Sequence, residues 1–329
     1  MIIEYMEERE KAPGSAAARR EPIPRAVHGQ FTYPYGVYPE DPFAQKEGYD
    51  SRYLKNEGCF YYEVIVSHEK IMETFFSLSQ LLPENVFIVT KIHSNDYYRD
   101  HDTYISEDLV PRKDAESWVA DWQDVALDDG FFGVGFFAEG ETVEVFLDDH
   151  KTIHVYHNNP DMVEATLERL GIPFEMDLKF FWDLPHYHEP LPLNEEYGDD
   201  FLTAFEDMAD LYELYLDEEE EENIDSEGTP LGVTCWKVEV RGYAPPKKGV
   251  EAAKGFYSTI YVNANSRKEV VELIDEHLAS KEEQVDLYLQ MARVPVELLT
   301  SDMRKLNADP DEPCVWFESE RVAFDWDQS

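Results

Sequence analysis

The sequence predicts an α+β protein of two domains, on three observations. Runs rich in aromatic and β-branched residues alternate with runs of helical periodicity, in the ββαβ and βαβ orders found in ferredoxin-like units. The 329 residues are 43% hydrophobic, which is enough for two cores. A proline-rich stretch near the middle of the chain separates two such series of elements.

These observations divide the chain into four parts. Residues 1–56 mix proline, glycine and tyrosine without periodicity and are predicted to form an extended arm. Residues 57–181 and 194–329 are predicted to be two α+β domains, of which the second is strongly acidic. Residues 182–193, with the sequence WDLPHYHEPLPL, are predicted to link the two domains.

The first domain is expected to open with a strand, a helix and a second strand over residues 59–92. A helix and three strands are then predicted at residues 112–127, 131–140, 141–149 and 151–157. The next helix is marked by Pro160 at its first position and by Gly171 as its stop. A last strand is predicted at residues 173–181.

The second domain is expected to begin with an amphipathic helix over residues 199–216. Strands are predicted at residues 233–243, 256–263, 284–294 and 314–319. The helix between the second and third of these strands has Ser266 as its N-cap and Glu269 three residues later, which is the spacing of a capping box. Pro295 is predicted to open a further helix.

The net charge of −43 is the most unusual property of the chain. It makes nucleic acids and anionic membranes poor partners, whereas basic proteins and cations suit it. A salt-adapted proteome, general solubility and a deliberately anionic binding surface are three competing explanations. The charge is unevenly spread, because residues 180–236 hold 18 carboxylates and neither Lys nor Arg. This distribution favours a local function for the acidic segment.

Four carboxylates of the predicted acidic helix recur at steps of four, three and four residues: Glu206, Asp210, Glu213 and Asp217. Helical neighbours at this spacing lie about 5 to 6 Å apart, so this acidic row could imitate the phosphates of a nucleic-acid strand. The glutamates that follow would steer a basic partner from a distance: Glu218, Glu219, Glu220, Glu221 and Glu222. The competing interpretation is a solvated helix face and an acidic linker. Weak Ca²⁺ binding is a third, although the EF-hand pattern is absent.

Histidines gather at three places in the sequence. In PHYHEP, His186 and His188 would lie on one face of a strand, with Glu189 beside them. The other two groups are His93 with His101 and Asp102, and His150 with His154 and His157. If these groups converged they could hold Zn²⁺ or Fe²⁺ for hydrolysis, but none completes a known metal signature. Surface or interface histidines are the alternative.

Other features narrow the class of protein. The three cysteines are widely spaced and lie in strand-like runs, so they are predicted to be buried free thiols. The sequence contains no nucleophile elbow and no P-loop, and the two glycines of GFFGVGFF are better explained by a buried strand. No apolar run reaches the roughly 20 residues that span a bilayer, and the first residues are acidic. A cytoplasmic protein is therefore expected.

The leading hypothesis is a non-enzymatic acidic protein that binds a basic surface on a partner protein. The most specific version of this hypothesis is an immunity-type inhibitor that binds a nucleic-acid-binding enzyme by mimicking nucleic acid. No cofactor is expected for it. The first alternative is a hydrolase that depends on a divalent metal held by the histidines. The second is a structural or housekeeping protein of a salt-adapted cell.

Overall fold

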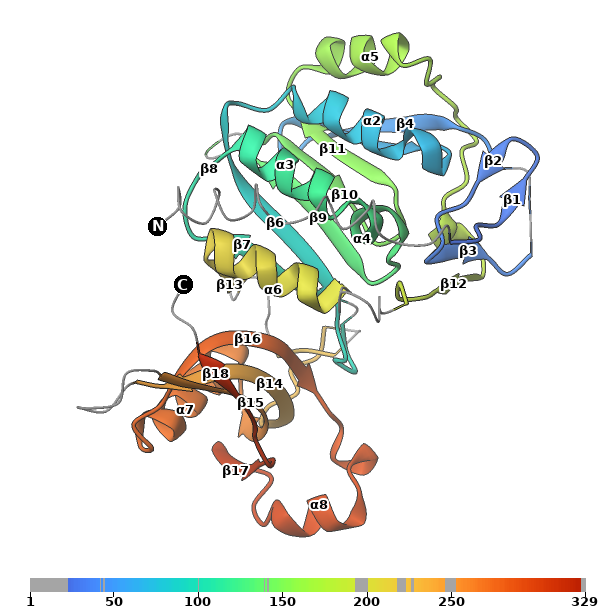
Figure 1. Cartoon of the computed structure of the whole chain (residues 1–329). Helices are drawn as coiled ribbons and strands as arrows, with labels where there is room; N and C mark the ends of the chain where they lie inside the picture. Colours follow the sequence, from blue (N-terminus) through green and yellow to red (C-terminus); the bar gives the residue numbers. More distant parts are fainter. Residues whose placement is uncertain are drawn as a thin grey trace. The chain divides into compact units, whose positions relative to one another are not determined.

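The computed structural model describes residues 23–41, 43, 45–99, 101–138, 140, 142–192, 201–217, 223–225, 228–245 and 253–326. Within these residues the chain has seven α-helices and 18 strands in several sheets, which confirms the α+β class (Figure 1). It divides into two compact units. The N-terminal unit takes its described residues from 23–92 and 103–214, and the C-terminal unit from 93–102 and 215–326.

The N-terminal unit is built on a nine-stranded sheet. In spatial order its strands are β13 (Leu214–Leu216), β7 (His101–Ser106), β6 (Asn85–His93), β9 (Phe132–Phe137), β10 (Glu144–Leu147), β11 (Ile153–His157), β5 (Cys59–Ile65) and β4 (Gly48–Leu54). The ninth, β8 (Val110–Pro111), pairs with β6, and the pairs from β6 across to β4 are antiparallel. Strand β9 is buried at five of its six residues, as predicted, and a Cβ at Gly135 would lie 2.5 Å from the Val145 carbonyl oxygen.

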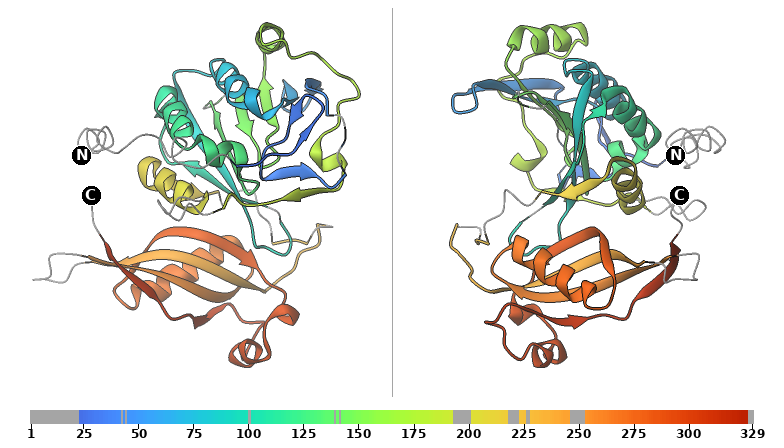
Figure 2. Two further views of the ribbon diagram at one scale, coloured as in Figure 1. Left: turned by 45° about the vertical axis from the view of Figure 1, so that its right-hand side comes forward. Right: turned by 90° about the vertical axis from the view of Figure 1, so that its left-hand side faces the viewer.

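Five helices belong to this unit: α2 (His68–Ser79), α3 (Arg112–Asp121), α4 (Gln123–Asp128), α5 (Pro160–Arg169) and α6 (Phe201–Tyr212). Helices α2, α3 and α4 lie on the same side of the sheet (Figure 2). The buried apolar side chains of α2 face the core, where the Phe75 ring packs 5.5 Å from that of Phe136 on β9. Helix α5 begins at Pro160 as predicted.

The segments predicted as an arm and a linker contribute strands to this same unit. β1 (Val27–His28) pairs with β2 (Phe31–Thr32), and β3 (Val37–Pro39) pairs with β12 (His186–His188), which follows the short 3₁₀ helix η2 (Phe181–Asp183). Side chains of the predicted arm form a small core with Ile65 of β5 and with two residues just before the predicted linker: Phe31, Tyr33, Val37, Ile65, Phe180 and Phe181. The 182–193 segment is thus paired with chain about 150 residues before it, which local composition does not indicate.

The C-terminal unit has an antiparallel sheet in the order β16 (Gln284–Arg293), β14 (Thr234–Ala244), β15 (Ala253–Ala264), β17 (Cys314–Glu318), with β18 (Val322–Trp326) also on β15. Helix α7 (Arg267–Ala279) contacts β15, β16 and β17. The predicted cap is confirmed, since the Ser266 side chain accepts a hydrogen bond from the backbone N–H of Glu269. The helix predicted at Pro295 is shorter: a 3₁₀ turn η3 (Val296–Leu298) precedes α8 (Ser301–Leu306), which is capped by Thr300.

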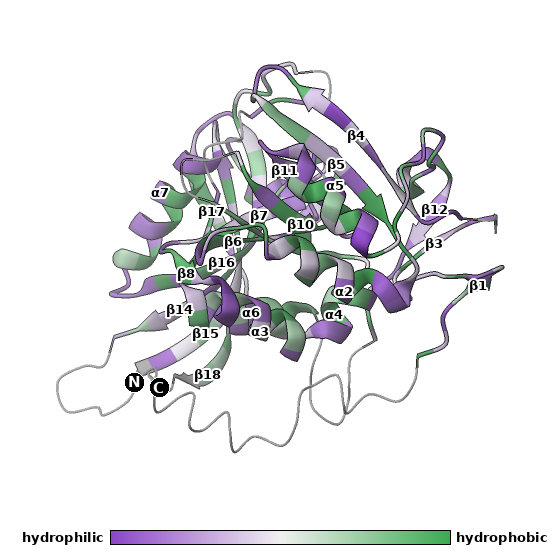
Figure 3. Ribbon diagram, turned by 90° about the horizontal axis from the view of Figure 1, so that it is seen from above, coloured by the Kyte–Doolittle hydropathy of each residue, from purple (hydrophilic) through white to green (hydrophobic). Residues whose placement is uncertain are grey.

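The described helices are amphipathic, and Figure 3 shows hydrophilic and hydrophobic residues mixed along α2, α5 and α6. None of them is both long and apolar enough to cross a bilayer.

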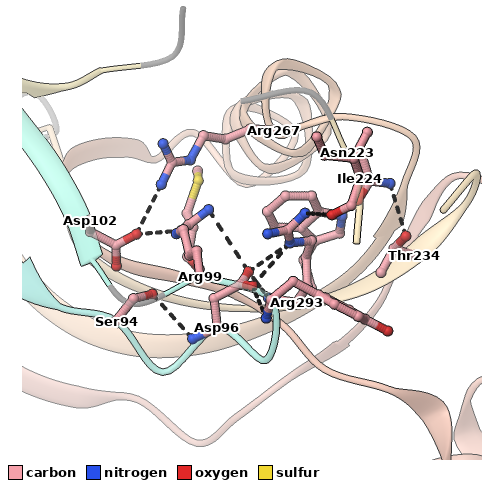
Figure 4. A network of polar contacts seen from close by, with 12 residues as sticks. Ser94, Asp96, Arg99, Asp102, Asn223, Ile224, Thr234, Arg267 and Arg293 are labelled. Atoms are coloured by element: carbon pink, nitrogen blue, oxygen red, sulfur yellow. Dashed lines mark hydrogen bonds and ion pairs between the residues drawn. The ribbon is translucent and has the colours of Figure 1, made fainter. Parts of the chain in front are cut away.

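A buried network of ion pairs in the C-terminal unit includes Asp96, Arg99 and Asp102. Asp102 accepts hydrogen bonds from Arg99 and Arg267, and Asp96 accepts from the side chain and backbone N–H of Arg293 (Figure 4). The Asp96 and Asp102 carboxylates are fully buried. Each buried charge therefore has a partner of opposite sign, as burial requires.

Candidate metal centre

Three histidine rings meet on the N-terminal unit. His186 and His188 are alternate residues of β12 and so project on one side of it. His150 comes from the turn between β10 and β11. The Nε2 atom of His186 lies 3.2 Å from that of His150 and 3.1 Å from that of His188. The three ligand atoms all lie within 4.8 Å of one another.

The other ring nitrogen of each histidine faces an oxygen atom. His186 Nδ1 lies 2.8 Å from the carbonyl oxygen of Leu184, and His188 Nδ1 lies 2.7 Å from that of Gly130. His150 Nδ1 lies 3.1 Å from Asp149 Oδ1. Because carbonyl and carboxylate oxygens only accept, each Nδ1 carries the hydrogen. In the neutral rings the three Nε2 lone pairs therefore face one another with no hydrogen between them.

The separations between the Nε2 atoms match those expected around a bound metal ion. Two nitrogens bound tetrahedrally to Zn²⁺ at about 2.0 to 2.1 Å lie about 3.3 to 3.4 Å apart. The 3.1 and 3.2 Å observed here are close to that spacing. Three protein ligands would leave one coordination position for water or substrate, as in catalytic rather than structural zinc sites.

The turn that carries His150 is tightly fixed. Asp148 Oδ1 accepts from the backbone N–H of Thr152 over 2.7 Å, and Lys151 has φ of +60°, which is rare for a residue with a side chain. The Lys151 ammonium group is buried and donates to the carbonyl oxygen of Phe132 over 2.6 Å. The position of His150 is thus set by backbone and side-chain bonds on both sides.

Aromatic rings border the site. The Trp182 ring stands edge-on to His150 at 5.5 Å and stacks on His154 at 6.0 Å and on Phe180 at 4.7 Å. His154 does not join the three histidines, because its Nε2 bonds Asp148 Oδ2 over 2.8 Å. Trp182 remains 39% exposed, so the cluster lies near the surface of the unit.

Burial and nearby charges shift the pKa values of His150 and His188. Burial lowers the pKa of His150, but its interactions with the Asp148 and Asp149 carboxylates outweigh burial and raise the pKa to about 10. The pKa of His188 is lowered, first by burial and then by its two histidine neighbours, despite the bond to Gly130 and the charge of Asp149. A metal ion would therefore displace a proton from His150 on binding.

The sequence-predicted ligands are partly brought together. His186 and His188 lie in the cluster, whereas Glu189 Oε1 accepts a 2.7 Å bond from the Tyr38 hydroxyl and is not part of the group. His157 is buried, and its Nδ1 accepts from the backbone N–H of Asn159. His93 ends β6 and His101 begins β7, and neither is part of the cluster. The sequence did not distinguish His150 from His154 and His157 as the ligand in its group.

The acidic residues predicted to bind a partner do not form one helical row. Glu206 and Asp210 lie on α6, but the helix ends at Tyr212 and Glu213 adopts φ of +51°. Asp217 follows β13, which continues the chain as an edge strand because Leu214 and Leu216 are buried there. The residues Glu218, Glu219, Glu220, Glu221 and Glu222 lie outside the described part of the chain.

A cavity of about 420 Å³ lies elsewhere on this unit and contains none of the three histidines. Its lining includes Tyr49, Phe174, Asp161, Glu164 and Glu168.

No protein family, curated protein or solved structure matches this chain. The assignment of a function therefore depends on the geometry of the chain itself.

Proposed function

We propose that this protein is a metal-dependent hydrolase in which His150, His186 and His188 bind one divalent transition-metal ion. The observation that supports the proposal is the orientation of the three rings. Their Nε2 atoms converge at 3.1 and 3.2 Å while every Nδ1 faces an oxygen acceptor. Such bonds to the second nitrogen are the usual means by which proteins orient metal-binding histidines.

The chemistry follows from the ligand set. Imidazole nitrogens suit Zn²⁺ and Fe²⁺, and three neutral ligands leave the full double charge on the ion. A water molecule in the open position would then have a pKa near 7 and supply a hydroxide nucleophile at neutral pH. The acidic surface of the chain would also raise the local concentration of cations.

Binding of a basic partner stays a prediction from the charge of −43, as does salt adaptation. The described carboxylates of the predicted acidic row are divided between α6 and the residues after it, so their geometry adds no support to phosphate mimicry.

The test of metal binding is a titration of metal-free protein with Co²⁺ and Zn²⁺, followed by metal analysis. We expect one equivalent per chain and the visible absorption of four-coordinate Co²⁺. The variants His150→Ala, His186→Ala and His188→Ala should each abolish the tight site. His28→Ala, which removes a histidine on β1 of the same unit, is the matched control. Equal binding by all five proteins would refute the proposal.

Hydrolysis is tested separately with p-nitrophenyl acetate, a generic probe of metal-bound hydroxide. Turnover should require the metal and be lost in His186→Ala but kept in His28→Ala. If the metal-loaded protein turned over neither this probe nor other ester and amide probes, the proposed metal site would stand and the hydrolase function would be excluded.

A further inference from the structure

One carboxylate faces two of the three candidate ligand rings. Asp149 Oδ1 lies 3.1 Å from His150 Nδ1, and Asp149 Oδ2 lies 3.6 Å from His188 Nδ1. The first distance is a hydrogen bond, and the second is an ion-pair contact beside the 2.7 Å bond from His188 to Gly130. The Asp149 side chain is only 9% exposed.

Asp149 thereby connects the two segments that build the site. His150 comes from the turn after β10, and His188 comes from β12, 38 residues later in the chain. The other bonds to the Nδ1 atoms of His186 and His188 come from backbone carbonyls and hold one ring each. Asp149, in contrast, faces a ring from each segment: one of its carboxylate oxygens lies near His150 Nδ1 and the other near His188 Nδ1.

The neighbouring Asp148 is engaged elsewhere. Its Oδ2 accepts from His154 over 2.8 Å and its Oδ1 accepts from the backbone N–H of Thr152. It lies 3.7 Å from His150 Nδ1, which is beyond hydrogen-bonding distance. Of these two adjacent carboxylates, only Asp149 therefore lies within hydrogen-bonding distance of His150 Nδ1.

We propose that Asp149 is the positioning residue of the metal centre and holds the His150 and His188 rings in their metal-binding orientation. This inference rests on the proposed metal site. A carboxylate behind an imidazole fixes the rotation of the ring and increases the basicity of the nitrogen that faces the metal. The turn that carries Asp149 is itself fixed by the bonds of Asp148 and Lys151, so the carboxylate is rigidly placed.

The experiment compares Zn²⁺ affinity, measured by competition with a chelating dye, and the Co²⁺ spectrum across four proteins. They are the native chain, Asp149→Asn, Asp149→Glu and the control Glu189→Gln, which removes the charge of a carboxylate next to His188 that bonds Tyr38 rather than a ligand ring. Asp149→Asn should lower the affinity by about 10- to 100-fold and shift the Co²⁺ bands. Asp149→Glu keeps the charge but moves the oxygens, so it should also shift the bands, whereas Glu189→Gln should retain the native spectrum.

Each outcome decides the question. Native affinity and spectrum in both Asp149 variants would overturn the positioning role and leave the metal site standing. A loss of equal size in Glu189→Gln would assign the effect to charge alone and would also overturn it. A native chain that binds two equivalents, one of them lost in Asp149→Asn, would make Asp149 a ligand instead. A native chain that binds no metal would overturn the site and the inference together. Thermal unfolding of the metal-free variants identifies any that fail to fold, and Asp149→Glu then serves as the deciding variant.

Discussion

The indole N–H of Trp118 donates a 2.8 Å hydrogen bond to the carboxylate of Asp207. The same oxygen accepts a 3.0 Å bond from the indole of Trp122. Both tryptophans are buried at the end of α3, and Asp207 lies on α6. The Asp207 carboxylate therefore connects α6 to the two tryptophans at the end of α3. Phe205 and Met208, on the apolar face of α6, are buried in the same unit.

Replacing Asp207 should destabilise the N-terminal unit. Asp207→Ala leaves two buried indole N–H groups without this acceptor, which we expect to lower the free energy of unfolding by about 2 to 3 kcal/mol. Asp210→Ala removes an exposed carboxylate from the same helix and should change it by less than about 0.5 kcal/mol. Urea unfolding followed by tryptophan fluorescence measures both. Equal effects of the two substitutions would show that the indole bonds do not stabilise the unit.

The ion-pair network of the C-terminal unit makes a second prediction. Arg293 is 3% exposed, and it also lies over the rings of Tyr98 and Trp236. Asp96→Ala would leave this guanidinium group buried without its carboxylate, at a cost of about 3 to 5 kcal/mol. Asp302→Ala, which breaks the exposed pair with Lys305, should cost less than about 1 kcal/mol. Denaturant unfolding of the two variants gives the comparison, and a small loss in Asp96→Ala would mean that water or another group compensates Arg293.

Local elements were well predicted where the signal is contained in a few neighbouring residues. The Pro160 start of α5 and the Ser266 cap of α7 are decided by side chains within one helical turn. The pairing of β3 with β12 was not predictable, because it depends on contacts between segments about 150 residues apart. The same applies to the end of α6, where burial of Leu214 and Leu216 in an edge strand overrides the helical periodicity.

The candidate site was predictable only in part for the same reason. The H-x-H spacing places His186 and His188 on one side of any strand, whatever the fold. That His150 meets them depends on where β12 lies beside the β10–β11 turn, which no local pattern specifies. Glu189 was predicted as a ligand because it is next to His188 in the sequence. In the structure its carboxylate accepts a hydrogen bond from the Tyr38 hydroxyl.

The three cysteines should differ in reactivity. Burial raises the pKa of the Cys235 thiol to about 12, and burial, with help from nearby carboxylates, also raises the pKa values of Cys59 and Cys314. Cys59 and Cys235 are buried, while Cys314 is partly exposed. Because the thiolate is the nucleophile, iodoacetamide at pH 8 should modify native Cys314 slowly and the other two only after unfolding. Mass spectrometry of timed samples, with urea-unfolded protein as the control, measures the rates. Rapid alkylation of native Cys235 would contradict this prediction.

The Glu318 carboxylate makes the stability of the C-terminal unit depend on pH. Burial alone would raise its pKa, but hydrogen bonds from Lys281, His277 and Arg321 outweigh burial and lower the pKa to about 2 from an ordinary value of 4.5. A group whose pKa is lower in the folded state stabilises the protein above its unfolded pKa. This contribution should therefore be complete above about pH 5 and disappear as the pH falls from 4.5 toward 2.

The test is the difference in unfolding free energy between native protein and Glu318→Gln, measured from pH 7 to pH 2. At pH 7 the variant should be less stable by about 1 kcal/mol, a modest value because the cluster lies close to the surface. The difference should shrink toward zero near pH 2, where the native carboxylate is also becoming protonated. Glu320→Gln, at an exposed residue two positions after Glu318 and just beyond the end of β17, should show almost no difference at any pH. A gap between native protein and Glu318→Gln that stays constant down to pH 2 would mean that the charge of Glu318 is not what stabilises the fold.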